Sequence, residues 1–490
     1  MNIEKQNNGG AGTGGLGYGL AMVQDQPWTL ESVLTATGGR LLGKKRQVVF
    51  RSVCTDTRSL EPGDLFLALT GENFDGAAFA AEAAAKGAAG LVLEGPPVST
   101  LPVPVVLVED TLKALGDLAA WRRGRMADLR VLAITGSSGK TTVKEMTAAI
   151  LARKFPILKT SGNFNNLVGL PLSLLPVDSR YRIAVLEMGM NRPGEIARMT
   201  EIAVPELACI NNIQSAHLQG LDDLTGVARA KGELFAGLES GATMVVNLDD
   251  PLVREMAERY PQTRITFGLN RQALVRATRI GAGSAKGISF TLHLGLEQTR
   301  VRLRCVGRHN VSNALAAAAL AHGVGVGLDG IRLGLEEFTP YDKRLQIDEL
   351  PGGLRLVNDT YNANPASMLA ALETVQGLRR HHRAVVVLGD MLELGGESRA
   401  AHRFIGAAVA RLNFDYLLAF GTYAGELVEA AREAGLSAER CLVFASKAKI
   451  VDFLKDLQDS DRLGSGDWLL VKGSRGVRME TVIADMKEAR

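Results

Sequence analysis

The segment from Ala133 to Met146, "AITGSSGKTTVKEM", constrains the fold more than any other part of the sequence. It starts within "RVLAIT", an apolar run with the length of a buried strand, and it ends within "TTVKEMTAAILARKF", whose apolar spacing is helical. A glycine loop between a buried strand and a helix N-terminus presents backbone N–H groups to an anion. The segment therefore predicts a phosphate-binding loop. The alternative is a glycine turn that carries a surface lysine.

Strand-like apolar runs alternate with helical sequence along most of the chain. Between residues 129 and 339, the runs "RVLAIT", "RIAVLEM", "ELACINNI" and "ATMVVNL" predict a parallel sheet with crossover helices. Between 340 and 490, "RAVVVLGD", "YLLAFG", "CLVFAS" and "DWLLVKG" favour a doubly wound, Rossmann-like unit. Residues 25–128 combine short apolar runs with an alanine-rich helix. We predict three α/β domains with these boundaries, in agreement with the roughly three domains that the chain length suggests.

Composition argues against several classes of function. The chain has 56 Lys and Arg residues against 53 Asp and Glu, a net charge of +3, which gives no electrostatic case for nucleic acid or an anionic membrane. No apolar run reaches the roughly 18 residues of a membrane span. The four cysteines lie far apart without metal-binding spacing, as in reduced cytosolic proteins. Residues 1–24 are glycine-rich with little to bury, and we expect them to form a disordered extension.

The loop itself lacks the first glycine of the full GxxxxGK[ST] pattern, because Ile134 occupies that place. In this pattern the lysine reaches the outer phosphates of a nucleotide, and a threonine hydroxyl faces Mg²⁺. Glu187 ends the strand "RIAVLEM", where a carboxylate beside a phosphate loop would hold Mg²⁺, unless it is a solvated strand-end glutamate. The loop residues are Gly136, Ser137, Ser138, Gly139, Lys140, Thr141 and Thr142.

Two further residues are ambiguous from the local sequence. His217 follows the strand "ELACINNI", and a lone histidine there is more often structural or solvent-facing than a metal ligand. Lys231 lies in "ARAKGELFAGL", an expected helix, where a lysine is ordinarily solvated.

An ordered series of motifs resembles the Mur ligases, the ATP-dependent ligases that add amino acids to the bacterial cell-wall precursor. "DTYNANPASM" followed by "GDMLELG" is similar to the member that attaches D-alanyl-D-alanine. The motifs typical of the sibling that adds diaminopimelate do not occur in the sequence. The series is "TGSSGKTT", "GNFNN", "LEMGMNRPGEI", "SAHLQG", "AKGELF", "NLDDP", "GRHNVSNALAAAA", "DKRLQ", "NDTYNANPASM", "GDMLELG" and "LVKGSRG".

The resemblance implies an ATP- and Mg²⁺-dependent ligase that joins D-alanyl-D-alanine to UDP-N-acetylmuramoyl-tripeptide through an acyl phosphate. It implies that residues 25–128 bind the UDP-sugar, that residues 129–339 bind ATP in a P-loop ATPase-like domain, and that residues 340–490 form the ligase domain. It also implies a monomer in the cytoplasm, while the balanced charge predicts no nucleic-acid partner.

The resemblance assigns roles to the phosphate loop and its neighbours. The loop amides and Lys140 would bind the phosphates of ATP, and Thr141 and Glu187 would hold one Mg²⁺. His217 would hold a second. Lys231 would be carbamylated, because a lysine ammonium would repel two Mg²⁺ ions whereas a carbamate supplies oxygens and negative charge.

Three more residues would contact the nucleotide if the resemblance holds. Asn310 would lie at the adenine end, or instead form a helix N-cap. Arg344 and Asp359 would reach across from the third domain, the arginine towards the γ-phosphate. The alternative for Arg344 is a surface ion pair between domains.

The resemblance also places residues at the two other substrates. Thr57, Arg58, Asn163 and Asn166 would contact the UDP-sugar, although Arg58 also suits an interdomain salt bridge and the asparagines suit turns.

Tyr361, Asn362 and Asn364 would face the incoming dipeptide. They would otherwise belong to a loop that caps the next helix, with Pro365 in its first turn.

Two other functions stay open on the sequence. Another ligase of the superfamily, such as a folate polyglutamate synthase or a different wall-precursor ligase, would share the ATP core. A P-loop regulatory NTPase would hydrolyse ATP without an amine acceptor, but it would leave "AKGE" and "GRHNVSN" without a role. No general base for the amine stands out in the sequence.

Overall fold

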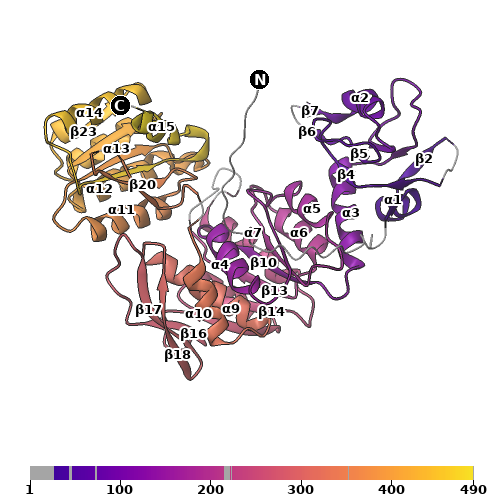
Figure 1. Cartoon of the computed structure of the whole chain (residues 1–490), viewed down its shortest axis with the longest axis horizontal. Coiled ribbons are helices and arrows are strands. Elements are labelled where there is room, and N and C mark those ends of the chain that lie inside the picture. The colour runs from indigo at the N-terminus through magenta and orange to yellow at the C-terminus, as the bar shows by residue number, and fades with distance from the viewer. Residues whose placement is uncertain are drawn as a thin grey trace, which may run out of the picture.

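The computed structural model describes residues 27–43, 47–71, 74–214, 221, 223–340, 342–350 and 352–488. Three α/β units follow one another along the chain, each built on its own sheet (Figure 1). The predicted fold class is therefore confirmed. The segment 1–24, predicted as an extension, lies outside the described residues.

The first unit contains a five-stranded sheet in the order β2-β9-β8-β5-β4, in which only β2 is antiparallel to its neighbour. Helix α3 leads out of this unit, and its N-cap Asp110 accepts a hydrogen bond from the N–H of Lys113. The elements are β1 (Trp28–Thr29), α1 (Leu30–Thr37), β2 (Arg40–Leu42), β3 (Val49–Phe50), β4 (Val53–Cys54), β5 (Leu65–Leu67), β6 (Thr70–Gly71), β7 (Phe74–Asp75), η1 (Gly76–Phe79), α2 (Ala80–Ala85), β8 (Gly90–Leu93), β9 (Val105–Leu107) and α3 (Thr111–Gly124).

The central unit is a nine-stranded sheet in the order β11-β12-β10-β13-β14-β15-β16-β17-β18. Its strands are parallel as far as β16, and β17 and β18 add an antiparallel extension that was not predicted from the sequence. The strands are β10 (Arg130–Thr135), β11 (Ile157–Lys159), β12 (Ile183–Glu187), β13 (Leu207–Ile210), β14 (Thr243–Asn247), β15 (Thr263–Gly268), β16 (Val275–Thr278), β17 (Ile288–Leu294) and β18 (Glu297–Leu303). The helices are α4 (Lys140–Leu151), α5 (Gly169–Leu174), α6 (Glu195–Ala203), α7 (Leu224–Ala236), α8 (Pro251–Glu258), α9 (His309–Gly323) and α10 (Leu328–Glu337).

The C-terminal unit is a six-stranded sheet in the order β19-β20-β24-β21-β22-β23, parallel except for β19. Because neighbouring parallel strands end at one edge, the segments after β20, β24 and β21 lie together, as expected for a ligand site in a doubly wound sheet. The strands are β19 (Gln346–Glu349), β20 (Arg355–Asp359), β21 (Ala384–Gly389), β22 (Tyr416–Phe420), β23 (Cys441–Phe444) and β24 (Trp468–Lys472). The helices are α11 (Pro365–Arg379), η3 (Gly395–Glu397), α12 (Ser398–Arg411), α13 (Ala424–Glu433), η4 (Ala438–Arg440), α14 (Lys447–Asp459), η5 (Arg475–Val477) and α15 (Glu480–Glu488).

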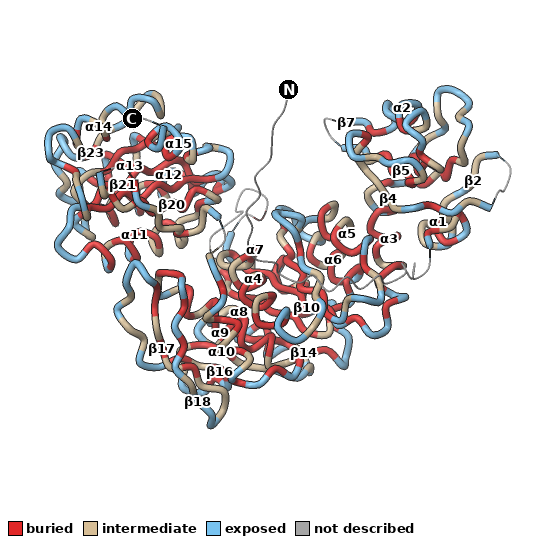
Figure 2. The backbone as a smooth tube through the Cα atoms, viewed as in Figure 1, coloured by how far each residue is buried: buried red, intermediate tan, exposed pale blue. Residues whose placement is uncertain are grey.

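The apolar cores show how the units are joined. Strands are buried and the covering helices are buried along one side (Figure 2). One hydrophobic cluster runs without a break from Trp28 and Leu118 of the first unit to Leu170 and Ile202 of the central unit. The buried residues of the C-terminal sheet form two other clusters, to which the central unit contributes Val306. The first and central units are thus packed through a shared core, whereas the C-terminal unit meets the central unit mainly through polar contacts described below.

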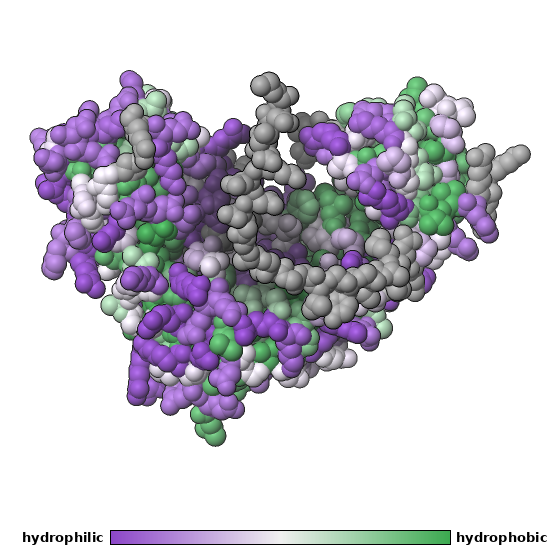
Figure 3. Space-filling model, in the orientation of Figure 1, coloured by the Kyte–Doolittle hydropathy of each residue, from purple (hydrophilic) through white to green (hydrophobic). Residues whose placement is uncertain are grey.

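The outer surface of the molecule is hollowed between the first and the C-terminal units, above the central unit (Figure 3). Within the parts of the chain that the structure describes, no helix is long and apolar enough to cross a membrane.

Gly406 allows the close approach of α12 and α13. A Cβ built on Gly406 would lie 2.0 Å from the carbonyl oxygen of Leu427, a backbone atom that cannot move aside. We expect Gly406→Ala to destabilise the C-terminal unit by about 1–3 kcal/mol through overpacking. Urea unfolding followed by circular dichroism measures this change.

Gly377 provides the matched control, because it lies inside α11 and a Cβ built on it would have nothing within 4 Å. Gly377→Ala should stabilise the protein by up to about 1 kcal/mol through helix propensity alone. If Gly406→Ala raises the free energy of unfolding as Gly377→Ala does, Gly406 is not required for the close packing of α12 and α13.

Candidate active site

The predicted phosphate loop lies between the end of β10 and the start of α4. Gly136 and Gly139 have φ angles of +152° and +78°, and a Cβ on Gly139 would lie 2.3 Å from Oδ1 of Asn313. Glycine is therefore required at position 139 by both conformation and space. The first-turn N–H groups of α4 have no intrahelical carbonyl to bind, and residues 137–142 line a cavity of about 1050 Å³. The loop has the backbone geometry of an anion site.

Two asparagines at the end of β13 hold this loop in place. The backbone carbonyl of Asn212 accepts a hydrogen bond from the N–H of Ser137 (3.0 Å). Its side-chain Oδ1 accepts a second one from the N–H of Ser138 (2.9 Å). Asn211 donates from Nδ2 to the carbonyl of Ser138 (2.9 Å). These asparagines were not predicted as site residues, because an "NN" pair after a strand is equally typical of a turn.

Lys140 lies over the loop and donates from Nζ to the carbonyl of Gly136 (2.8 Å). Burial lowers the pKa of Lys140, and the carboxylates of Glu187 and Glu393 act against that shift. A cation in this position is poorly compensated by the protein alone. An anionic group bound at the loop would supply the missing charge.

Thr141 and Glu187 meet between α4 and β12, and both are almost completely buried. Thr141 donates from Oγ1 to Oε2 of Glu187 (2.8 Å), and Asn165 donates from Nδ2 to the other carboxylate oxygen (2.8 Å). Glu187 is 3% exposed, so the solvated-glutamate alternative is wrong. Asn163 and Asn166 were predicted from "GNFNN" whereas Asn165 was missed, since nothing in the motif distinguishes the three.

Lys231 is fully buried on α7, which excludes the solvated alternative. The partner of its Nζ among the described residues is Sδ of Met190, at 3.9 Å. Burial, and then the nearby charge of Lys140, holds the pKa of Lys231 well below its usual value. An ammonium without a counter-charge is strongly disfavoured in such surroundings, so the site favours the neutral amine.

Arg344 reaches the phosphate loop from the C-terminal unit. Its Nη2 donates to Oγ1 of Thr141 (2.9 Å), and its guanidinium lies 4.1 Å from the ring centroid of Tyr361. Its Nε is buried and has no hydrogen-bond partner in the described part of the chain. Arg344 is therefore directed into the cavity, and the alternative of a surface ion pair is wrong.

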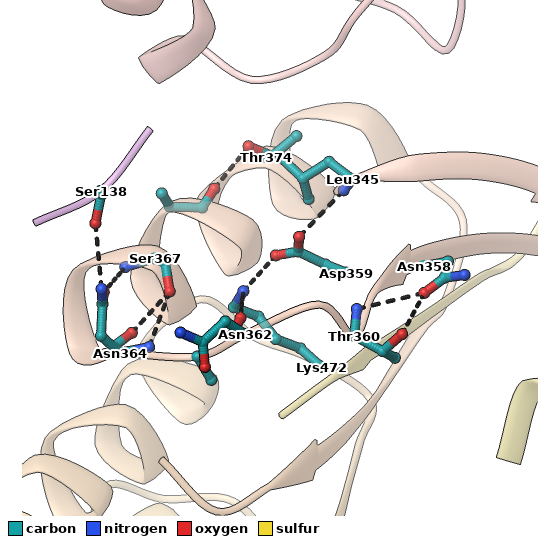
Figure 4. A network of polar contacts seen from close by, with 12 residues as sticks. Ser138, Leu345, Asn358, Asp359, Thr360, Asn362, Asn364, Ser367, Thr374 and Lys472 are labelled. Carbon is teal, nitrogen blue, oxygen red and sulfur yellow. Dashed lines mark hydrogen bonds and ion pairs between the residues drawn. The ribbon is translucent and has the colours of Figure 1, made fainter. Parts of the chain in front are cut away.

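An ion pair between Lys472 and Asp359 joins the ends of β24 and β20, close to Leu345 (Figure 4). Lys472 donates from Nζ to Oδ2 of Asp359 (2.5 Å) and to the carbonyl of Asn362 (2.9 Å), and the lysine side chain is 2% exposed. The other oxygen of Asp359 accepts the N–H of Leu345, the residue after Arg344 (3.1 Å). Asp359 therefore fixes the backbone beside Arg344, and its predicted contact with the nucleotide stays a prediction. Lys472 was not predicted.

Asn364 connects the same network to the phosphate loop. It accepts the N–H of Ser367 as the N-cap of α11, and its Nδ2 donates to Oγ of Ser138 (3.2 Å) (Figure 4). Pro365 occupies the first turn of α11, as predicted. The helix-capping alternative is therefore correct for Asn364, while Tyr361, Asn362 and Asn364 all line the cavity.

Asn310 lies in the first turn of α9 and does not form its N-cap, which is Arg308. Its Nδ2 donates to the carbonyl of Val306 (2.7 Å), and its Oδ1 accepts from Nδ2 of Asn313 (3.0 Å). The N-cap alternative is wrong, and Asn310 lines the cavity. Burial lowers the pKa of the adjacent His309 to about 4, so this imidazole is neutral at pH 7.

The residues predicted to contact the UDP-sugar do not form one cluster. Asn163 and Asn166 line the cavity, and Asn166 also accepts the N–H of Gly169 (2.8 Å) at the start of α5. Thr57 and Arg58 lie in the first unit and do not line it. Arg58 pairs locally with Asp56 (2.6 Å), so the alternative of an interdomain salt bridge is wrong.

The donor set at the loop suits Mg²⁺ better than a transition metal. Thr141 and Glu187 offer oxygen atoms, and Mg²⁺ usually takes one or two protein oxygens together with phosphates and water. No group of three or more His, Cys, Asp or Glu residues that could hold a metal ion occurs within the described ranges. His217, predicted as a second ligand, lies outside those ranges.

Comparison with known proteins gives matches along almost the whole chain. Three family models match: "Mur ligase family, catalytic domain" over residues 49–123, "Mur ligase middle domain" over 134–321 and "Mur ligase, glutamate ligase domain" over 343–475. A UDP-N-acetylmuramoyl-tripeptide–D-alanyl-D-alanine ligase from Escherichia coli is 39% identical, over 94% of this chain and 98% of the relative.

Two solved structures extend the similarity to three dimensions. A crystal structure of MurF from Acinetobacter baumannii aligns with a TM-score of 0.87 and 36% identity, over 94% of this chain and 99% of that chain. MurF ligase from Thermotoga maritima in complex with ADP aligns with a TM-score of 0.80 and 28% identity, over 89% and 97% of the two chains.

Lys472→Met removes the partner of a buried carboxylate. We expect it to destabilise the C-terminal unit by about 3–5 kcal/mol, because Asp359 would remain buried without a counter-charge. Chemical unfolding measures the change, and the double variant Asp359→Asn, Lys472→Met should recover much of the loss.

The matched control is Lys487→Met, which breaks the half-exposed pair of Lys487 with Asp348 (2.9 Å). That pair should contribute no more than about 1 kcal/mol. If Lys472→Met lowers the free energy of unfolding no more than Lys487→Met does, the pair of Lys472 with Asp359 does not support the site.

Proposed function

The chain belongs to the Mur ligase family, and from that premise we propose that it joins D-alanyl-D-alanine to UDP-N-acetylmuramoyl-tripeptide at the expense of ATP. The reaction forms an amide bond in a precursor of peptidoglycan. Relatives that are 39% and 36% identical carry the name of this ligase, and the chain spans nearly their full length.

One observation carries the mechanism: the hydrogen bond from Arg344 to Thr141 across the two units (2.9 Å). It puts a permanently charged guanidinium of the C-terminal unit beside the phosphate loop of the central unit. A planar, always-charged group in this place suits the charge that develops on a phosphoryl group during transfer.

The first chemical step transfers the γ-phosphoryl group of ATP to the terminal carboxylate of the tripeptide. A carboxylate is unreactive towards amines because its oxyanion is a poor leaving group, and phosphorylation converts it to an acyl phosphate with release of ADP. We assign the loop amides, Lys140 and Arg344 to the phosphates. Their work is positioning and charge neutralisation, which dominate catalysis of phosphoryl transfer.

The second step is attack by the free amine of D-alanyl-D-alanine on the acyl carbon. The tetrahedral intermediate that forms collapses to the amide, with loss of inorganic phosphate and of the amine proton. Thr141 and Glu187 would hold Mg²⁺, which would neutralise phosphate charge when bound, and His217 would hold a second ion. Asn310 would hold the adenine end, and Tyr361, Asn362 and Asn364 would face the dipeptide.

Lys231 is proposed to carry a carbamate. Carbamylation requires a neutral amine, and the burial that lowers the pKa of Lys231 favours that form. The buried amine has no carboxylate beside it among the described residues. A carbamate would turn the site from one that repels metal cations into one that attracts them.

The UDP-sugar is assigned to the first unit, with Thr57 and Arg58, and to Asn163 and Asn166 at the cavity. The two groups of residues lie in units that are packed through one apolar core. We expect a monomer that works in the cytoplasm, as the family resemblance implies.

The test is release of phosphate from ATP with purified protein, Mg²⁺ and UDP-N-acetylmuramoyl-tripeptide, with and without D-alanyl-D-alanine. Release should require both substrates and give a product heavier by the dipeptide. Lys140→Ala should reduce kcat by at least about 100-fold, because it removes a cation that contacts the transferring group. The matched control Lys154→Ala changes a lysine just beyond the end of α4 and should leave the rate unchanged.

Phosphate release that does not depend on the dipeptide would refute the acceptor. It would favour a sibling ligase with another acceptor or, if the UDP-sugar is also dispensable, a regulatory NTPase.

A further inference from the structure

The incoming dipeptide presents a charge that the reaction does not consume. Under the proposed function, on which this inference rests, its amine attacks the acyl phosphate while its terminal carboxylate stays ionised. A carboxylate removed from water needs a charged or hydrogen-bonding partner. The cavity should therefore hold a cation that the phosphate chemistry does not use.

Four described cationic side chains line the cavity, namely Lys140, Arg344, Lys472 and Arg475. Lys140 lies on the phosphate loop, where it donates to Gly136, and Arg344 donates to Thr141 of the same loop. Lys472 is committed to its ion pair with Asp359 at 2.5 Å. These three cations are accounted for by phosphate binding or by support of the fold.

Arg475 is the fourth cation and differs from the others in its surroundings. It is exposed in η5, directly after the "KGS" turn that ends β24. Within the described residues, its guanidinium has no carboxylate within ion-pair distance. Its neighbour is the ring of Tyr361, 5.5 Å from the guanidinium carbon.

Tyr361 relates Arg475 to the reacting end of the cavity. The same ring lies 4.1 Å from the guanidinium carbon of Arg344, which faces the phosphate loop. The two arginines are thus separated by one aromatic side chain. An extended dipeptide spans roughly 7 Å, so its amine can lie near the phosphoryl group while its carboxylate reaches Arg475.

The wall beside Arg475 suits small apolar side chains. Leu392 is 43% exposed and lines the cavity, and its Cδ1 would lie 3.0 Å from a Cβ built on Gly476. The exposed face of this leucine and the ring of Tyr361 offer apolar surface of the size of methyl groups.

We propose that Arg475 binds the terminal carboxylate of the dipeptide and so selects acceptors that end in a free acid. Tyr361 and Leu392 form the walls of this subsite. Arg475 is a binding residue here and has no part in phosphoryl transfer.

The experiment compares D-alanyl-D-alanine with its C-terminal amide as acceptors for the wild type and for Arg475→Gln. The wild type should prefer the acid by about 10- to 100-fold in kcat/KM, the usual effect of one charge-assisted pair. In Arg475→Gln, kcat/KM should fall by a similar factor for the acid and change little for the amide. The preference for the acid should therefore disappear. The KM values for ATP and for the UDP-sugar should stay unchanged.

Arg478→Gln is the matched control, because Arg478 is exposed just after η5 and does not line the cavity. It should keep the full preference for the acid. Arg475→Lys should retain part of the preference and provides a second variant if Arg475→Gln does not fold, as judged by its melting temperature.

Two results would overturn the assignment of Arg475. Either Arg475→Gln lowers kcat/KM equally for the acid and the amide, or the wild type has the same kcat/KM for both. In either case the wild type still ligates the dipeptide, and the proposed function stands. Failure of the wild type to ligate either acceptor would instead refute the proposed function, and this inference with it.

Discussion

Arg344 donates a hydrogen bond to Thr141, and this contact joins two units whose apolar cores meet at Val306 rather than over a broad face. The arginine is held between Lys343 and Leu345, whose φ angles of +60° and +48° are unfavourable for residues with side chains. Asp359 accepts the N–H of Leu345, and the N–H of Tyr361 donates to the carbonyl of Lys343 (3.2 Å). The C-terminal sheet thus compensates a strained backbone, and the strain places a guanidinium at the phosphate loop.

The charges around the phosphate loop explain why this part of the cavity suits an anion. Lys140 and Lys231 both have pKa values lowered by burial, and Lys140 contributes to the shift of Lys231. Glu187 and Glu393 oppose the shift of Lys140, but the oxygens of Glu187 already accept bonds from Thr141 and Asn165. Phosphates, a carboxylate and a carbamate would each relieve this imbalance, and each belongs to the proposed reaction.

Local patterns predicted those parts of the site that are contiguous in sequence. The strand, loop and helix around Lys140 follow from glycine positions and apolar spacing, and Glu187 follows from its place at a strand end. Lys472 was beyond prediction, because its partner Asp359 lies over 100 residues away and only the parallel pairing of β20 with β24 brings them together. The hairpin of β17 and β18 was missed for a different reason, since the other strands were predicted from continuous apolar runs. Its alternating burial produces no continuous apolar run.

The central claim is that the substrate carboxylate takes the phosphoryl group of ATP in a site completed by Arg344. The most direct measurement uses UDP-N-acetylmuramoyl-tripeptide with ¹⁸O in its terminal carboxylate. An acyl phosphate passes one carboxylate oxygen to the leaving phosphate, so the account predicts ¹⁸O in the inorganic phosphate by mass spectrometry. Ligation that yields unlabelled phosphate would contradict it, because the carboxylate would then have been activated without bonding to phosphorus.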